Sequence, residues 1–214
     1  PSDEHSYTRV TSIKKVIPYE PSLTALIARA AHPDTRIISF TVTEAGYYLG
    51  PDNALAPAAA AIASDLAAVK AGKPGSTIYG ALAVMLKARQ QAGSGPVTLL
   101  CCDNLRHNGD RSRSGLLQFI TRLGDTDLLA WIEANTTSPN DMVDRITPRP
   151  APDVAERVLA ATGKVDQAAV MGESFLQWVI EENFIAGRPA WEKVGVEMVD
   201  SVAAYEEAKI RLLN

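Results

Sequence analysis

The sequence predicts an α/β fold built around a mostly parallel sheet. Two stretches, 36–42 and 96–102, are apolar on both faces and rich in strand-forming residues, as strands are when helices cover both sides of a sheet. Each runs directly into a cluster of polar residues. Open α/β sheets build their sites at the carboxyl ends of such strands. We therefore expect functional residues just after these two strands.

The part of the chain before the first apolar strand predicts one further strand and one short helix. Residues 7–16 alternate loosely between polar and apolar side chains, as a strand with one solvent-exposed face does. Apolar residues at helical spacing over 23–31 follow Ser22, which predicts a helix with Ser22 as its N-cap.

Helical patterns lie on both sides of the second apolar strand. Residues 57–71 are rich in alanine, begin with a proline and end at a glycine. Residues 77–92 place their large apolar side chains on one face, and residues 114–135 are helical apart from an interruption at Gly124. Helices and strands therefore alternate, as an α/β fold requires.

The last third of the chain predicts shorter elements. Residues 136–148 fit neither a clean helix nor a clean strand. Asp153 and Glu156 resemble a capping box for a helix that ends at Gly163. Residues 194–199 predict a last short strand, and residues 202–214 begin a new helix.

Composition excludes several classes of partner. The chain has 214 residues, 46% of them hydrophobic, which is enough for a full core. A net charge of −4 and a pI near 5.4 provide no basic patch for nucleic acid or an anionic membrane. The sequence contains no apolar run of the roughly 20 residues that span a bilayer, and it does not begin like a signal peptide. We expect a monomeric cytoplasmic protein with no nucleic-acid or membrane partner.

The two cysteines, Cys101 and Cys102, are adjacent, so they make a poor disulfide pair. The sequence also offers no spaced set of cysteines and histidines that could hold zinc. We expect both cysteines to be reduced core residues, and we expect no metal site.

Lys209 is the chemically suggestive residue of the last stretch. Glu206 lies three positions before it and so shares its helical face, whereas Asn214 lies about 140° further round the helix. A lysine acts as a general base only as the neutral amine, which burial favours. The alternative is a surface Glu–Lys pair worth about 0.3–0.5 kcal/mol. Spacing alone favours this surface pair.

Four other candidate residues each have a structural alternative. Glu44 follows the first apolar strand, but its position before a glycine on its own favours a turn carboxylate. Asn104 follows the second strand and could donate to a developing alkoxide, or it could cap the next helix through an Asx-turn. Asp144 and Arg145 on their own would suggest a structural ion pair.

Four separated blocks resemble the polyol-specific long-chain dehydrogenases, the mannitol dehydrogenase family. Residues 39–47 are Ser-Phe-Thr-Val-Thr-Glu-Ala-Gly-Tyr, and residues 103–109 are Asp-Asn-Leu-Arg-His-Asn-Gly. Residues 139–148 are Pro-Asn-Asp-Met-Val-Asp-Arg-Ile-Thr-Pro, and residues 205–214 are Tyr-Glu-Glu-Ala-Lys-Ile-Arg-Leu-Leu-Asn. Each matches the fixed positions of a family block.

The resemblance implies a Rossmann-type dinucleotide-binding domain that lacks its amino-terminal part and ends in the first helix of an α-helical carboxyl-terminal domain. Residues 1–200 would be the later part of the Rossmann-type domain, and residues 201–214 the start of the helical domain. The family's phosphate-binding segment and a histidine three residues past Asn214 would fall outside the chain. We therefore expect the chain alone to be inactive.

The resemblance also implies an activity, which is NAD-dependent oxidation of a secondary hydroxyl of a sugar alcohol to a ketose by metal-independent hydride transfer. Lys209 would be the general base. Asn104 and Asn214 would stabilise the alkoxide, and Glu206 or Glu44 would relay the proton to solvent.

The same family blocks imply binding roles for other residues. Asp144, with its neighbours Val143 and Arg145, would contact the hydroxyls of the polyol. Thr43 and Asp103, together with Asn104, would contact NAD.

Phe40 and Tyr48 resemble the arabinitol branch of the family, so conversion of D-arabinitol to D-xylulose is the expected reaction. A D-mannitol 2-dehydrogenase or a reductase of the fructuronate or altronate type is the alternative. A non-catalytic module that binds a nucleotide or sugar is a more distant one, since fold alone does not fix activity. A zinc alcohol dehydrogenase is disfavoured because the sequence lacks a ligand set.

Overall fold

The computed structural model describes residues 6–56 and 59–213, which fall into two compact units. The larger unit comprises Tyr19–Val143 and Gln177–Asn214, and the smaller comprises Pro1–Pro18 and Asp144–Leu176. The segment that begins at Asp144 therefore interrupts the sequence of the larger unit. The predicted domain boundary between residues 200 and 201 falls within the larger unit.

The larger unit contains a parallel sheet in the order β1-β2-β3. β1 (Ile37–Phe40) pairs in parallel with β2 (Val97–Cys101), and β2 pairs in parallel with β3 (Thr136–Thr137). Every residue of β2 is buried, as expected for a central strand with both faces covered. The prediction of a parallel sheet with two apolar strands is confirmed.

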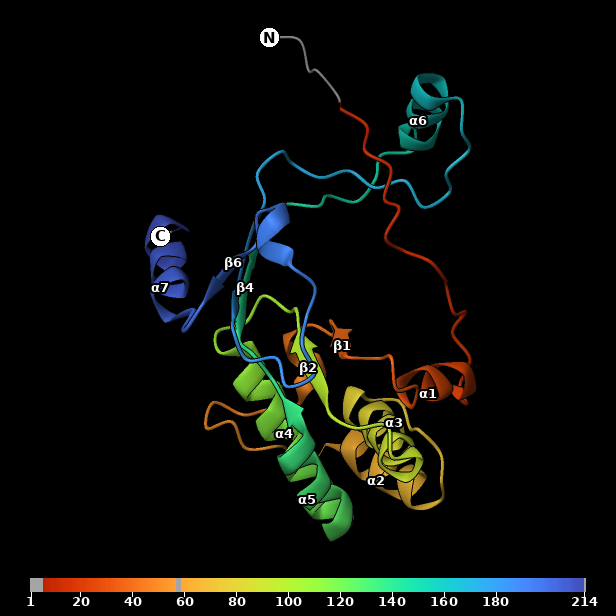
Figure 1. The fold of residues 1–214 in the computed structure, drawn as a ribbon, viewed down its shortest axis with the longest axis vertical. Helices are drawn as coiled ribbons and strands as arrows, with labels where there is room; N and C mark the ends of the chain where they lie inside the picture. The colour runs from red at the N-terminus through yellow and green to blue at the C-terminus, as the bar shows by residue number, and fades with distance from the viewer. Residues whose placement is uncertain (1–5, 57–58, 214) are drawn as a thin grey trace. The chain divides into compact units, whose positions relative to one another are not determined.

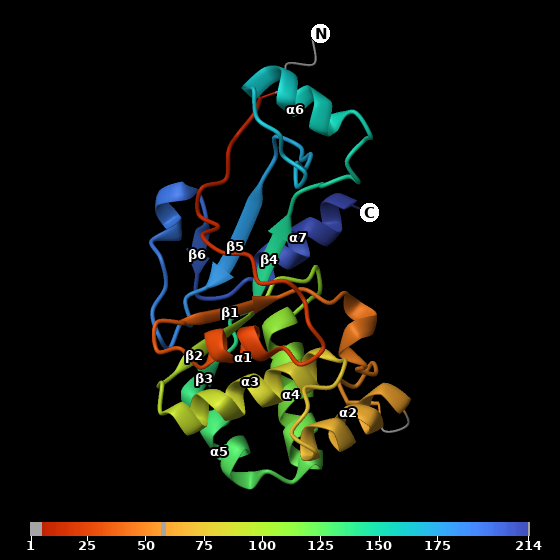
Figure 2. The same cartoon turned by 90° about the vertical axis from the view of Figure 1, so that its right-hand side faces the viewer.

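Helices α1 (Thr24–Ala30), α2 (Ala60–Lys70), α3 (Ile78–Ala92), α4 (Asn108–Leu123) and α5 (Thr126–Asn135) belong to the same unit. Helix α3 contacts the other four helices, and α4 also contacts β2 (Figures 1 and 2). The alternation of strands and helices that the sequence predicts is therefore present. Helix α3 is the central helix of the unit.

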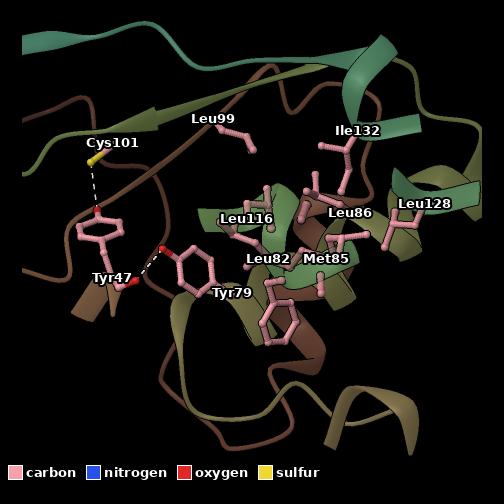
Figure 3. Close-up of a cluster of buried hydrophobic side chains, with 14 of the residues drawn as sticks. Tyr47, Tyr79, Leu82, Met85, Leu86, Leu99, Cys101, Leu116, Leu128 and Ile132 are labelled. Atoms are coloured by element: carbon pink, nitrogen blue, oxygen red, sulfur yellow. Dashed lines mark hydrogen bonds between the residues drawn. The ribbon is translucent and has the colours of Figure 1, made fainter. Parts of the chain in front are cut away.

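The hydrophobic core lies where α3 and α4 meet β2 (Figure 3). The rings of Tyr79 on α3 and Phe119 on α4 stack with their centroids 6.0 Å apart. Leu82, Met85 and Leu86 are all buried, which confirms the apolar face predicted for α3. Full burial of each such side chain stabilises the fold by about 1.5–3 kcal/mol.

Several helix ends differ from the predicted ones. Helix α1 begins after Leu23, whose φ is 51°, and Ser22 does not cap it but accepts a hydrogen bond from the Thr24 hydroxyl. Helix α4 begins at Asn108 instead of near residue 114. Its predicted interruption is a real end, because Gly124 takes a φ of 80° and the Asp125 carboxylate then caps α5.

The carboxyl-terminal part adds a second sheet in the order β4-β5-β6 and a last helix. These elements are β4 (Asp141–Asp144), β5 (Gln177–Glu181), β6 (Glu197–Val199) and α7 (Ala203–Leu213). The last predicted strand is thus present in shorter form. The segment 136–148, which fits no regular pattern in sequence, contributes two short strands because each finds a partner elsewhere in the chain.

The smaller unit contains α6 (Val154–Thr162) and long irregular segments. The helix predicted here is present, but Asp153 does not act as the predicted capping-box residue, since its carboxylate pairs with Arg157 at 2.9 Å. Residues 7–16, which lie in the described part of the chain, run as exposed irregular chain, so the predicted strand is wrong. An alternating pattern forms a strand only where another strand pairs with it.

Candidate active site

Two turns at the carboxyl edge of the first sheet are joined by one carboxylate. Asp103 follows β2, and its side chain accepts hydrogen bonds from the backbone N–H groups of Val42 and Thr43, both at 2.9 Å. The Tyr47 hydroxyl donates to the same carboxylate at 2.5 Å. Asp103 therefore holds the turn after β1 against the turn after β2. The polar clusters that follow β1 and β2 therefore lie against each other at one edge of the sheet.

Thr43 has a backbone conformation that the sequence did not reveal. Its φ is 64° and its ψ is 163°, a region that is unfavourable for a β-branched residue. The Asp103 carboxylate maintains this conformation by binding the Thr43 N–H. The chain then enters the short helix η1 (Glu44–Tyr47). Strain of this kind is typical of functional sites.

Tyr47 and Cys101 form a neutral buried pair beneath these turns. The Tyr47 oxygen lies 3.0 Å from the Cys101 sulfur, and the Tyr79 hydroxyl donates to the Tyr47 carbonyl at 2.8 Å (Figure 3). Burial raises the pKa of Tyr47 and raises the pKa of Cys101 to about 11. Both side chains are therefore protonated at neutral pH. Cys101 is a free thiol in the core, as predicted, whereas the free thiol of Cys102 is only partly buried.

Asn108 ties the turn after β2 to the start of β4. Its buried amide donates to the carbonyls of Cys101 at 2.9 Å and Asp103 at 3.0 Å, and it also donates to the Asp141 carboxylate. Its oxygen accepts from the Asp141 N–H at 2.9 Å. The adjacent Gly109 permits this approach, since a Cβ there would lie 2.4 Å from the Pro139 carbonyl oxygen.

Lys209 on α7 reaches both of these segments. Its Nζ donates to the Asn104 Oδ1 at 3.1 Å and to the Val143 carbonyl at 2.7 Å. These groups border a pocket of about 190 Å³, which is lined by residues from 104–106, from 141–143 and from α7. The structure therefore brings Lys209, Asn104 and Val143 together. Asn104 contacts the lysine instead of capping the next helix.

Glu206 lines the same pocket one turn before Lys209. Its side chain is only 5% exposed, and Oε1 accepts from the His107 N–H at 2.9 Å. The other oxygen, Oε2, lies 3.8 Å from the Arg106 Nε and 3.9 Å from the His107 Nε2. The prediction that Glu206 and Lys209 share one face is confirmed. They do not form a simple surface pair, because Glu206 is buried and binds other groups.

Asp141 is a site residue that the sequence analysis missed. It lines the pocket, is 1% exposed, and accepts from the Trp178 Nε1 at 2.7 Å as well as from Asn108. Burial raises its pKa to about 6. Asp141 occupies a position that varies in the family block 139–148, so the resemblance to the family did not identify it. No helical or strand periodicity identified it either.

The remaining predicted catalytic and substrate-binding residues are Glu44, Asp144, Arg145 and Asn214. Glu44 is mostly exposed and pairs with Arg111 at 3.8 Å, outside the pocket lining. Asp144 and Arg145 belong to the smaller unit, where the Arg145 Nε donates to the Glu173 carbonyl. Asn214 lies outside the described residues.

The residues that the structure describes, 6–56 and 59–213, offer neither a cluster of metal ligands nor a membrane-spanning helix. Among those residues, no group of three or more histidine, cysteine, aspartate or glutamate side chains is placed to hold a metal ion. None of the helices described is both long enough and apolar enough to cross a membrane.

The chain is similar to proteins of one known family. The family model of the mannitol dehydrogenase Rossmann domain matches residues 2–193. A D-arabinitol 4-dehydrogenase of Ralstonia nicotianae is 54% identical over the whole chain, and one of Klebsiella pneumoniae is 49% identical. The chain covers 45% of the first relative and 46% of the second, so it spans about half the length of the curated relatives it matches.

A solved structure gives the same result for the fold. Mannitol 2-dehydrogenase of Pseudomonas fluorescens, in a ternary complex with NAD and D-mannitol, is 41% identical and superposes with a TM-score of 0.80. The match covers 88% of this chain and 38% of that one.

Proposed function

The chain belongs to the mannitol dehydrogenase family, and from this premise we propose that the full-length protein is an NAD-dependent polyol dehydrogenase. It oxidises a secondary hydroxyl of a sugar alcohol to a ketose. One observation carries the proposal: an amine and an amide from distant parts of the chain, Lys209 and Asn104, meet at 3.1 Å on the wall of a pocket. The Rossmann-type fold supports it.

Lys209 is the general base of the proposed reaction. In its neutral form its Nζ removes the proton from the substrate hydroxyl while a hydride leaves the carbinol carbon, so that a ketone forms. The half-buried amine lies between two neutral acceptors, the Asn104 amide oxygen and the Val143 carbonyl. These two acceptors fix the position of the amine at the wall of the pocket.

Asn104 also provides a hydrogen-bond donor, its amide nitrogen Nδ2. Because its Oδ1 accepts from Lys209, its Nδ2 is the group that can donate to the substrate oxygen. Such a donor stabilises the negative charge that develops on that oxygen as the proton leaves. Asn214 would add a second donor.

The chemistry of the pocket fits a nicotinamide cofactor. Its side chains include an amine, an amide and carboxylates, and none of these can accept a hydride. NAD supplies that acceptor when it is bound. Thr43, Asp103 and Asn104 lie on the turns after β1 and β2, where open parallel sheets bind dinucleotides, so they are the residues that would hold it. Asp103 would contribute to NAD binding indirectly, because its carboxylate binds the backbone of the turn after β1.

Glu206 is the group that moves the proton onward in this proposal. It lines the pocket one helical turn from Lys209, and the Arg106 side chain beside it is mostly exposed. A proton released by Lys209 would pass to solvent through this carboxylate. Glu44 is less suitable for that route, because it pairs with Arg111 outside the pocket lining.

D-Arabinitol is the favoured substrate. The relatives at 54% and 49% identity are named D-arabinitol 4-dehydrogenases, whereas the mannitol 2-dehydrogenase with the solved structure is 41% identical. Phe40 and Tyr48 agree with this choice. Contacts of Asp144, Val143 and Arg145 with the substrate hydroxyls belong to the same proposal.

The test is NADH formation from D-arabinitol by the full-length protein. Lys209→Ala should lower kcat/KM by about 10²–10⁴, the range that general bases supply, with little change in NAD affinity. Lys193→Ala, which removes an exposed lysine of the same unit, is the matched control and should leave kcat/KM unchanged. Wild-type kcat/KM in Lys209→Ala would overturn the proposal.

A further inference from the structure

Asn104 and Val143, two acceptors that position Lys209, lie on segments that one pair of side chains ties together. Asn104 is on the turn after β2, and Val143 is on β4. Asn108 holds the first segment through the carbonyls of Cys101 and Asp103. The same amide also binds Asp141, two positions before Val143.

The link between Asn108 and Asp141 has two points. The Asn108 Nδ2 donates to the Asp141 carboxylate, and the Asp141 backbone N–H donates to the Asn108 Oδ1. A two-point contact fixes orientation as well as distance. Both residues are almost fully buried, so water does not compete for these bonds.

We propose that Asp141 is a positioning residue, which with Asn108 sets the distance between the two acceptors of Lys209 and thereby the direction of its amine. The inference rests on the proposed function of Lys209 as the base. Asp141 acts through the backbone of β4 and the turn after β2, without taking part in the reaction itself. Loss of this link lets Asn104 and Val143 move apart, and proton transfer then becomes slower.

Trp178 provides a matched control. It donates to the other oxygen of the Asp141 carboxylate at 2.7 Å, so Trp178→Phe removes one hydrogen bond of Asp141 but leaves the link to Asn108 intact. Its ring also packs 5.3 Å from that of Trp191, a contact that phenylalanine can largely retain. A general loss of stability around Asp141 would therefore affect this variant too.

The experiment measures kcat/KM and the solvent deuterium isotope effect for polyol oxidation by the full-length protein. Asp141→Ala should lower kcat/KM about 10- to 100-fold and raise the isotope effect, while NADH affinity stays within about twofold. Trp178→Phe should change neither quantity. A purely structural role would reduce the active fraction without raising the isotope effect, so an unchanged isotope effect in Asp141→Ala overturns the inference.

A double variant tests the link from the opposite direction. In Asp141→Asn only one of the two side-chain atoms that face Asn108 and Trp178 is still an acceptor. The other is an amide nitrogen, which would face the N–H donor of Trp178 or of Asn108 without forming a hydrogen bond. Adding Trp178→Phe removes one donor, so the amide oxygen introduced at position 141 can accept from Asn108 again. This double variant should recover most of the kcat/KM lost in Asp141→Asn, and failure to recover it contradicts the inference.

Combination with Lys209→Ala separates this inference from the proposed function. If Asp141 acts through Lys209, Asp141→Ala should cause little further loss in the Lys209→Ala background, because the effects of coupled residues are not additive. Additive losses would overturn the role of Asp141 and leave Lys209 as the base. Full activity of Lys209→Ala would instead reject the proposed function.

Discussion

Lys209 Nζ lies 3.1 Å from Asn104 Oδ1, although 105 positions separate the two residues in the chain. The contact forms because α7 packs where the turn after β2 meets the start of β4. It orients the Asn104 amide, since the oxygen faces the lysine and the nitrogen is left to face a substrate. The two residues therefore form one unit, and their variants should differ in a defined way.

Asn104→Ala and Asn104→Asp separate the two tasks of this side chain. The alanine variant removes the donor to the alkoxide and should lower kcat/KM for polyol oxidation by about 10²–10³. The aspartate variant places a negative charge beside Lys209, which stabilises its ammonium form. In that variant the rise of kcat/KM with pH should move to higher pH than in wild type. Equal pH profiles for wild type and Asn104→Asp would contradict the assigned contact.

Thr43→Gly tests whether the unusual backbone of the first turn is strained. Glycine adopts a φ of 64° and a ψ of 163° without the steric cost that threonine bears, about 1–3 kcal/mol, although it adds about 0.5–1 kcal/mol of chain entropy to the unfolded state. The exposed Thr43 side chain contributes little packing. The variant should therefore be more stable by about 1 kcal/mol, as measured by urea denaturation.

Thr41→Gly is the control for this change. Thr41 is also exposed, but its φ is not in the positive region, so glycine should destabilise the protein there. If both glycine variants lost stability to the same extent, Thr43 would not be strained. Lower polyol turnover in the stabilised Thr43→Gly variant would connect the turn to function.

The sequence predicted those elements whose causes are local. The apolar runs that became β1 and β2, and the one-sided spacing of α3, lie within single segments, and the structure confirms them. Residues 7–16 alternate as a strand does, but pairing is not a local property, and the prediction of a strand there is wrong.

The site shows the same division. Lys209 and Asn104 were identified by resemblance to a family, because helical spacing alone favoured a surface pair. The sequence did not mark Asp141 as a pocket residue, because its partner Asn108 lies 33 positions away in the chain. It did not mark Thr43 as strained, because its partner Asp103 lies 60 positions away. Burial and strain imposed by distant segments leave no pattern in the nearby sequence.

Chelation should leave polyol oxidation unchanged. The proposed reaction uses an amine and an amide where a zinc enzyme uses a metal ion to stabilise the alkoxide. Prolonged treatment of the full-length protein with EDTA, followed by removal of the chelator, should preserve kcat/KM within about twofold. Loss of activity that added zinc restores would contradict a metal-independent mechanism.

The stability of the protein should depend on the ionisation of Asp141. Burial raises the pKa of Asp141 to about 6, whereas an aspartate in an unfolded chain has a pKa of about 3.9. Between these values the folded state binds more protons than the unfolded state, so the contribution of Asp141 to stability is present at pH 4 and is lost as pH rises through about 6.

Asp141→Asn removes this titration and provides the reference for measuring it. The free energy of unfolding of wild type, minus that of Asp141→Asn, should fall by up to roughly 3 kcal/mol between pH 4 and pH 7. Urea denaturation of both full-length proteins at unit pH intervals measures the difference. Trp178→Phe removes a donor that favours the carboxylate, so the decline should extend to higher pH in that background. A difference that rises with pH would mean that the hydrogen bonds from Asn108 and Trp178 outweigh burial.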